Sequence, residues 1–217
     1  MIDNCSNEML YKGILFRSPL EAQWASFFDV IGIRYQYRPA RFSLSRGVST
    51  GLDSWYEPQF FLVDDRKWFE AFPRLGRSEL WRISWALVFG RHIRSCTPPW
   101  PSSSDCYLLA IGPVGADSEK DPQSGIFSVA DIGLDEPEAI ICGGGATLTW
   151  AQCRGCGKIS LYNDEDGLLS WPDEIVSECC GLEQTGYSAQ RDSPELLRAY
   201  QRAHSLAIND GAEPGVT

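Results

Sequence analysis

The residues best suited to chemistry lie in a predicted β-hairpin, whose strands Trp55–Val63 and Lys67–Phe72 are joined by a short polar turn. Gln59 and Glu70 meet across this hairpin if it pairs symmetrically about the turn. Two carboxylates placed in this way, with a lysine two residues after the second, are typical of a Mg²⁺ site for phosphodiester hydrolysis. Here a glutamine stands at the first position and Phe72 at the lysine position.

A helix is predicted before this hairpin. Ser18 and Glu21 have the spacing of a capping box, Pro19 suits the first helical position, and Gly32 is a typical stop. Large apolar residues recur between them at helical spacing, namely Leu20, Trp24, Phe27, Phe28 and Ile31. The residues from Tyr11 to Arg17 read as one edge strand leading into this helix.

The pattern of apolar and polar residues divides the chain into three parts. Residues 1–135 predict an α/β core, with an extended segment at Ile33–Leu44 and further elements whose residues are mainly apolar. These elements are a buried helix at Glu79–Phe89 and strands at Tyr107–Val114 and Gly125–Ile132.

Residues 136–190 form a predicted cysteine lobe that begins with a strand at Ala146–Ala151. Residues 191–217 predict a capped amphipathic helix, opened by Ser193 and Pro194, and a tail. Leu196, Leu197, Tyr200, Ala203 and Leu206 are expected on its apolar side.

Three segments together resemble the PD-(D/E)xK nuclease superfamily, the restriction-endonuclease-like proteins: FRSPLEAQWASFFDVIGIRYQYRP, YEPQF and KWFEAF. The likeness is greatest to small actinobacterial and phage-associated members. It implies a mixed sheet flanked by helices, here with a zinc-ribbon-like knuckle and a C-terminal helix added. It also implies acids that hold Mg²⁺ and a lysine that steadies the nucleophile.

Carried onto this chain, the resemblance assigns the helix glutamate to Glu21, the first strand acid to Gln59, the second acid to Glu70 and the lysine to Phe72. Two of these positions depart from the pattern. Glutamine supplies none of the charge that retains a metal, and phenylalanine supplies no cation. Glu57, two residues before Gln59, is the acid that could take over as a ligand.

Each of these acids also has a structural interpretation. Glu21 is explained by helix capping alone. Glu70 stands in a predicted strand that is otherwise mainly aromatic. Such an acid is expected either in a strand at the edge of the sheet or in a functional site. Both interpretations stay open at this point.

Arg34, Arg38 and Arg41 alternate with aromatic residues, a pattern that suits a nucleic-acid backbone with bases stacked on rings. The alternative is a solvated edge strand whose positive charge opposes aggregation.

Cys153 and Cys156, followed by glycine, have the spacing of a zinc knuckle. Cys179 and Cys180 are the nearby candidates for the other two ligands, and Cys142 or an outside group could replace one of them. The alternatives are a redox pair or plain buried thiols. A closed four-ligand site would make Zn²⁺ structural, and Mg²⁺ is expected only if the acids are active.

Charge is distributed unequally. Residues 1–100 carry 13 Lys and Arg against 10 Asp and Glu, whereas residues 101–217 carry 6 against 19. Nucleic acid could therefore bind only the first half, and the acidic second half favours a protein partner. No apolar run reaches the length of a membrane span and no secretory signal is visible, so an intracellular, cytoplasmic location is expected.

These patterns favour a nuclease-fold protein with a decayed metal site that binds nucleic acid or a protein. The resemblance suggests a phage, mobile-element or defence setting. The alternatives are an active Mg²⁺-dependent DNA endonuclease using Glu21, Glu57 and Glu70, and an acidic inhibitor or scaffold protein.

Overall fold

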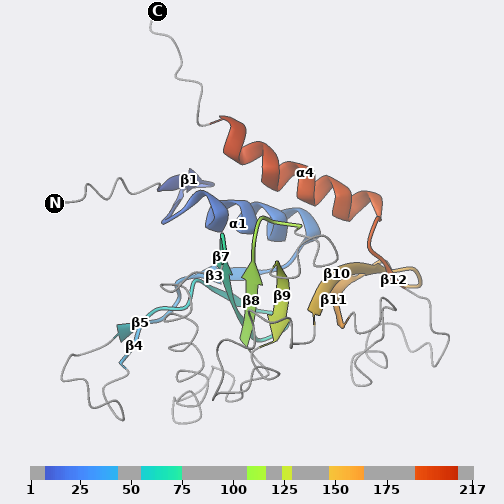
Figure 1. The fold of residues 1–217 in the computed structure, drawn as a ribbon. Coiled ribbons are helices and arrows are strands. Elements are labelled where there is room, and N and C mark those ends of the chain that lie inside the picture. Colours follow the sequence, from blue (N-terminus) through green and yellow to red (C-terminus); the bar gives the residue numbers. More distant parts are fainter. Residues whose placement is uncertain are drawn as a thin grey trace, which may run out of the picture.

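The fold was analysed in a computed structural model (Figure 1). It describes residues 8–43, 55–74, 107–115, 124–128, 147–163 and 189–209. The described part is a mixed α/β structure with a multistranded sheet and two helices. The predicted helix at 79–89, residues 129–132, Cys142, Cys179 and Cys180 lie outside the described residues.

The first helix, α1 (Pro19–Ile31), begins and ends where the sequence predicts. The Ser18 hydroxyl accepts a hydrogen bond from the Glu21 backbone N–H at 3.3 Å. Gly32 closes the helix in the left-handed conformation, with φ of 76°, and donates its N–H to Phe28. The side chains of Trp24, Phe27 and Phe28 are buried, as their helical spacing predicts.

The single strand predicted at Tyr11–Arg17 is wrong, because this region is a hairpin. Strands β1 (Met9–Tyr11) and β2 (Ile14–Phe16) pair antiparallel. Lys12 and Gly13 form the turn with φ of 49° and 81°. Two successive positive φ values match the twist of a tight hairpin, which explains why the chain reverses at this glycine.

One mixed sheet organises the described core. Its order is β11-β10-β9-β8-β7-β6-β3, and β12 pairs with β10. The bounds are β3 Tyr35–Tyr37, β6 Phe60–Leu62, β7 Lys67–Phe72, β8 Tyr107–Ile111, β9 Gly125–Ser128, β10 Thr147–Cys153, β11 Ile159–Asn163 and β12 Ala189–Gln190. The β7–β8 pair is parallel and the other pairs are antiparallel. Strands β10 and β11, from the cysteine-bearing region, thus extend the same sheet.

The predicted strand Trp55–Val63 is interrupted. Its first part, β5 (Trp55–Tyr56), pairs with β4 (Phe42–Ser43), and only its last part, β6, pairs with β7. Pro58 lies at the break, where it has no N–H to offer a neighbouring strand. The extended segment Ile33–Leu44 is divided too, because Arg38 adopts φ of 48° between β3 and β4.

Both described helices lie on the same side of the sheet (Figure 1). Helix α1 covers the face formed by Phe60, Leu62, Phe69 and alternate residues of β8. The Trp24 and Phe69 rings pack edge to face, with centroids 4.8 Å apart.

The second described helix, α4 (Pro194–Asn209), packs on α1 and β10. Ser193 caps it by accepting the Leu196 N–H at 3.3 Å, as predicted. Leu196, Ala199 and Ala203 are buried, but Leu197 is 47% exposed, so its predicted place on the apolar side is wrong. The apolar stripe follows positions 196, 199 and 203 because these share the face that meets α1.

Within the described residues, neither helix has the length and apolarity required to cross a membrane.

Candidate functional site

Gln59 is engaged with the backbone of the neighbouring strand. Its side-chain oxygen accepts the Ala71 N–H at 2.7 Å, and its side-chain nitrogen donates to the Ala71 carbonyl at 3.2 Å. In the register that pairs Phe60 with Phe69, the residue opposite Ala71 is Pro58. Because proline has no N–H, the Gln59 amide takes the place of a strand partner. A carboxylate could not do this, since it has no donor for the Ala71 carbonyl.

Glu70 is fully buried within β7. Its carboxylate accepts the Tyr56 hydroxyl at 2.5 Å, and the Tyr56 and Tyr107 hydroxyls are also hydrogen-bonded. Burial raises the pKa of Tyr107 well above its ordinary value, and the Glu70 charge raises it further. Phe72, at the expected lysine position, is buried too. The acid is therefore part of a buried carboxylate–phenol cluster.

Glu21 is held at the start of α1. One carboxylate oxygen accepts the Arg17 backbone N–H at 2.9 Å and the Tyr37 hydroxyl at 2.6 Å. Burial raises the pKa of Tyr37 above its ordinary value, and the hydrogen bond to Glu21 adds to the shift. These contacts fit the capping interpretation, with the carboxylate reaching the residue before the cap.

Glu57 lies in an ion-pair cluster with two arginines. Its carboxylate meets the Arg17 guanidinium at 3.4 Å and also pairs with Arg38. Arg38 further donates its backbone N–H to the Gln59 carbonyl at 2.8 Å. Arg17 thus joins Glu21, through its backbone, to Glu57, through its side chain.

The three acids of the endonuclease alternative are not gathered at one point. Phe69 and Ala71 face α1, so Glu70 between them faces the opposite side of the sheet. Glu21 lies on the α1 side, bonded to Tyr37, whose ring packs on Phe60. Among the residues that the structure describes, no three His, Cys, Asp or Glu side chains form a group able to hold a metal ion.

The predicted arginine surface lies around β3, an edge strand of the described sheet. Arg34 forms a bidentate ion pair with Asp64 and thereby lowers the pKa of that carboxyl. Arg38 pairs with Glu57, and Arg41 is exposed. Arg34 and Arg38 are therefore engaged by carboxylates of the chain itself.

The segment predicted to form a knuckle, Cys153 to Gly157, lies at the tip of the β10–β11 hairpin. Cys153 ends β10 and is buried, whereas Cys156 is exposed in the turn. Gly157 follows with φ of 74°, which agrees with the glycine expected after a knuckle.

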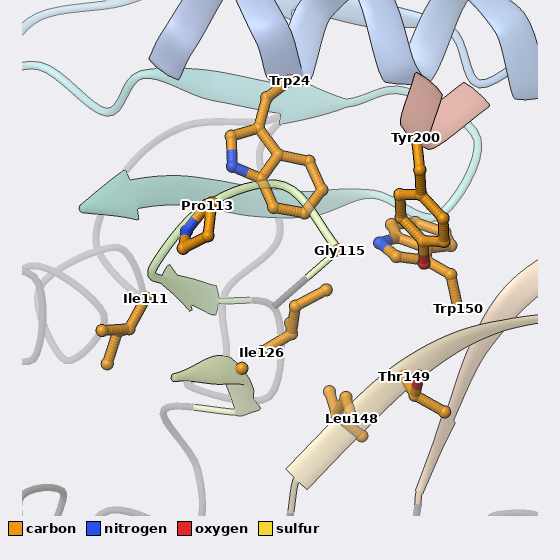
Figure 2. A pocket seen from close by; sticks show the side chains of 10 residues that line it. Trp24, Ile111, Pro113, Gly115, Ile126, Leu148, Thr149, Trp150 and Tyr200 are labelled. Atoms are coloured by element: carbon orange, nitrogen blue, oxygen red, sulfur yellow. The ribbon is translucent and has the colours of Figure 1, made fainter. Parts of the chain in front are cut away.

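A small open recess lies between α1, α4 and strands β8 to β10 (Figure 2). Trp24, Trp150 and Tyr200 line it, and none of the predicted site residues does. Within the described part of the chain, neither buried indole N–H has a hydrogen-bond acceptor. Figure 2 shows the Trp150 nitrogen directed toward the turn that carries Gly115. The wall of the recess combines these aromatic rings with aliphatic side chains, including Ile111, Ile126 and Leu148.

The sequence did not identify the phenols that bind the acids, namely Tyr37, Tyr56 and Tyr107. Tyr56 and Tyr107 are 51 positions apart, so no local spacing relates them. The available signal was the abundance of tyrosine next to the candidate acids, which does not specify pairs.

Comparisons with protein-family models, with curated proteins and with solved structures find no match.

Proposed function

We propose that this chain is a non-catalytic binding module built on a restriction-endonuclease-like core, and that its ligand is a protein. The order of elements supports such a core: α1, the antiparallel strands β3, β6 and β7, and then β8 parallel to β7. This is a mixed sheet with a helix on its face, as the resemblance implies.

The observation that carries the proposal is the double hydrogen bond between Gln59 and Ala71. The position assigned to the first metal ligand instead completes the sheet where Pro58 interrupts it. Glu70 is fully buried against Tyr56, and Glu21 caps α1 against Tyr37. Glu21, Gln59 and Glu70 therefore each have a structural role.

Charge favours a protein over nucleic acid. Arg34 and Arg38 each pair with a carboxylate of the chain, Asp64 and Glu57, so a phosphate bound there would have to compete with these ion pairs. The second half of the chain carries 6 basic against 19 acidic residues, so a partner with a basic surface complements it.

The first experiment tests catalysis. Purified protein is incubated with supercoiled plasmid and Mg²⁺ or Mn²⁺, and we expect the plasmid to stay intact at high protein concentration. Nicking by the wild type that disappears in Glu70→Ala would establish the endonuclease instead.

The second experiment distinguishes the ligands. Fluorescence anisotropy with labelled duplex DNA is measured at low and high salt, for the wild type and for a variant in which Arg34, Arg38 and Arg41 are all glutamine. We expect weak binding that the substitutions leave unchanged. Tight, salt-sensitive binding that the variant loses would assign the module to nucleic acid.

A positive result for a protein ligand requires direct binding. A partner trapped by cross-linking is purified and titrated against the full chain. We expect saturable one-to-one binding that weakens as salt rises. Failure of every purified partner to bind directly would overturn the protein assignment.

A further inference from the structure

The β1–β2 hairpin is separate from the main sheet and lies against α1 on the helix side of that sheet (Figure 1). In the described part of the chain, its two strands pair only with each other. Met9 and Phe16, which lie opposite each other, are buried in the core cluster. Because side chains alternate along a strand, the next pair, Leu10 and Leu15, projects from the other face. The hairpin therefore has an inner face in the core and an outer face that carries a leucine pair.

The leucine pair is left in water. Leu10 is 71% exposed and Leu15 is 55% exposed. Five large apolar side chains are exposed among the described residues, and three of them lie in this hairpin, with Ile14 as the third. Contact between the two leucines adds at most about 1 kcal/mol to the hairpin and leaves most of both side chains exposed. Single apolar residues are ordinary on a protein surface, whereas neighbouring ones mark contact surfaces.

Polar contacts hold both ends of the hairpin without using its outer face. At the turn, Asp29 of α1 accepts the Tyr11 hydroxyl at 3.0 Å and forms an ion pair with Lys12 at 2.8 Å. At the other end, the Arg17 backbone N–H donates to the Glu21 carboxylate at 2.9 Å. Three-residue strands form only a marginal hairpin on their own, so these contacts fix it on α1. The leucine pair is therefore presented on a preorganised surface.

The charges beside the leucine pair make the outer face complementary to a second copy of itself. Glu8 precedes β1 and Arg17 follows β2, so these two exposed residues flank the pair at the same end, one on each strand. Two hairpins stacked about a two-fold axis parallel to the strands place Leu10 of one copy against Leu15 of the other. The same operation places Glu8 of each copy against Arg17 of the other. The Arg17 side chain is 59% exposed although it contacts Glu57, so it has donors left for a second carboxylate.

We propose that the outer face of the β1–β2 hairpin is a self-association surface, through which two copies of this chain form a symmetric dimer. The leucine pair of each copy packs on that of the other, and Glu8 pairs with Arg17 across the two-fold axis. The contact is small beside the roughly 800 Å² per partner of a standard interface, so the dimer is weak and depends on protein concentration. The proposal does not rest on the proposed function, because self-association requires no other partner.

Sedimentation equilibrium of the full chain over a wide range of concentrations tests the dimer. The ionic strength is held at about 0.15 M, which screens the repulsion between two copies of net charge −10. We expect a monomer–dimer equilibrium that shifts toward the dimer as the concentration rises. Leu10→Ser and Leu15→Ser should each raise the dissociation constant of the dimer about tenfold, because both copies lose an apolar contact.

Leu197→Ser is the matched control for the two hairpin substitutions. Leu197 is also exposed, at 47%, but it lies on α4, so its substitution should leave the dissociation constant unchanged. All three substitutions are at exposed positions, and circular dichroism verifies that each variant is folded. A chain that stays monomeric at every concentration would overturn the proposal, and so would a dimer that the hairpin substitutions leave intact.

The arrangement of the dimer is tested by reversing charges. Glu8→Arg and Arg17→Glu should each weaken self-association, because like charges then face each other across the axis. Mixed in equal amounts, the two variants should form a heterodimer, because every charged pair across the axis is again opposite in sign. A mixture that associates no more tightly than either variant alone would refute this arrangement.

The remaining alternative is that a different protein occupies the outer face. In that case the wild type is monomeric, and Leu10→Ser and Leu15→Ser abolish its binding to the partner trapped by cross-linking. This result would assign the hairpin to that partner and overturn self-association.

Discussion

The side chain of Gln59 and the backbone of Ala71 form a pair of hydrogen bonds, at 2.7 Å and 3.2 Å, that reproduces a strand pairing. The glutamine is both donor and acceptor, and it is nearly fully buried. A position that the sequence motif marks as a lost metal ligand therefore has a structural role that an acid could not fill.

Replacing Gln59 by glutamate should destabilise the protein. The carboxylate would face the Ala71 carbonyl without a proton to donate, at a cost of about 2–4 kcal/mol in the free energy of unfolding. Because the folded state disfavours this charge, the pKa of the introduced carboxyl is raised. The loss should grow as pH rises through the carboxyl range and shrink in acid. Urea unfolding at several pH values measures it.

The exposed residue Gln36 in β3 provides the control for that substitution. Gln36→Glu should change the unfolding free energy by less than about 0.5 kcal/mol. If Gln59→Glu were as mild as Gln36→Glu, the Ala71 bonds would contribute nothing to stability.

The 2.6 Å hydrogen bond between Tyr37 and Glu21 should be measurable by a double-mutant cycle. Tyr37→Phe and Glu21→Gln should each cost about 1–2 kcal/mol, with a coupling energy of about 1 kcal/mol. Thermal unfolding of the four proteins gives this coupling. Additive effects would show that Glu21 and Tyr37 act independently.

The ion pair between Arg34 and Asp64 should keep the pKa of the Asp64 carboxyl below its ordinary value. Arg34→Gln should raise the pKa of Asp64 back toward its ordinary value, as observed by NMR. With its pKa lowered in the folded state, Asp64 contributes stability above its unfolded pKa and loses it as pH falls. The lowering of the Asp64 pKa and its contribution to stability should both diminish at 1 M salt, because the ion pair is exposed. An unchanged Asp64 titration in the variant would contradict the pairing.

Gly115→Ala should be costly because the residue has φ of 78° and lies against Tyr200. We expect a loss of about 2–4 kcal/mol, part from the backbone and part from the ring contact. In a Tyr200→Ala background only the backbone part, about 1–2 kcal/mol, should remain.

Gly32→Ala is the matched control for Gly115→Ala. Gly32 has φ of 76° and no atom within 4 Å of an added Cβ, so it isolates the backbone cost. Equal losses at the two glycines in chemical denaturation would refute the contact with Tyr200.

For α1 and α4, sequence patterns predicted the ends of the helices better than they predicted the strands. Ser18 and Ser193 cap the starts of α1 and α4, and Gly32 ends α1, as expected, because each cap depends only on residues a few positions away. The strand predicted at Trp55–Val63 failed because pairing with β4 on one side and β7 on the other divides it at Pro58. No local pattern reports which strand a segment will pair with.

The residues around the candidate site show the same division. Side chains alternate along β7, so Glu70 shares a face with Trp68 and not with Lys67 whatever the strand pairs with. The tight turn at Cys153–Gly157 likewise agrees with the local spacing of the two cysteines and the glycine. What the acids bind was decided by the tertiary structure. Glu21 meets Tyr37 across 16 positions, and Gln59 meets Ala71 across 12. Such contacts depend on strand register and on how α1 lies on the sheet, whereas caps, turns and parity depend only on neighbouring residues and the geometry of the backbone.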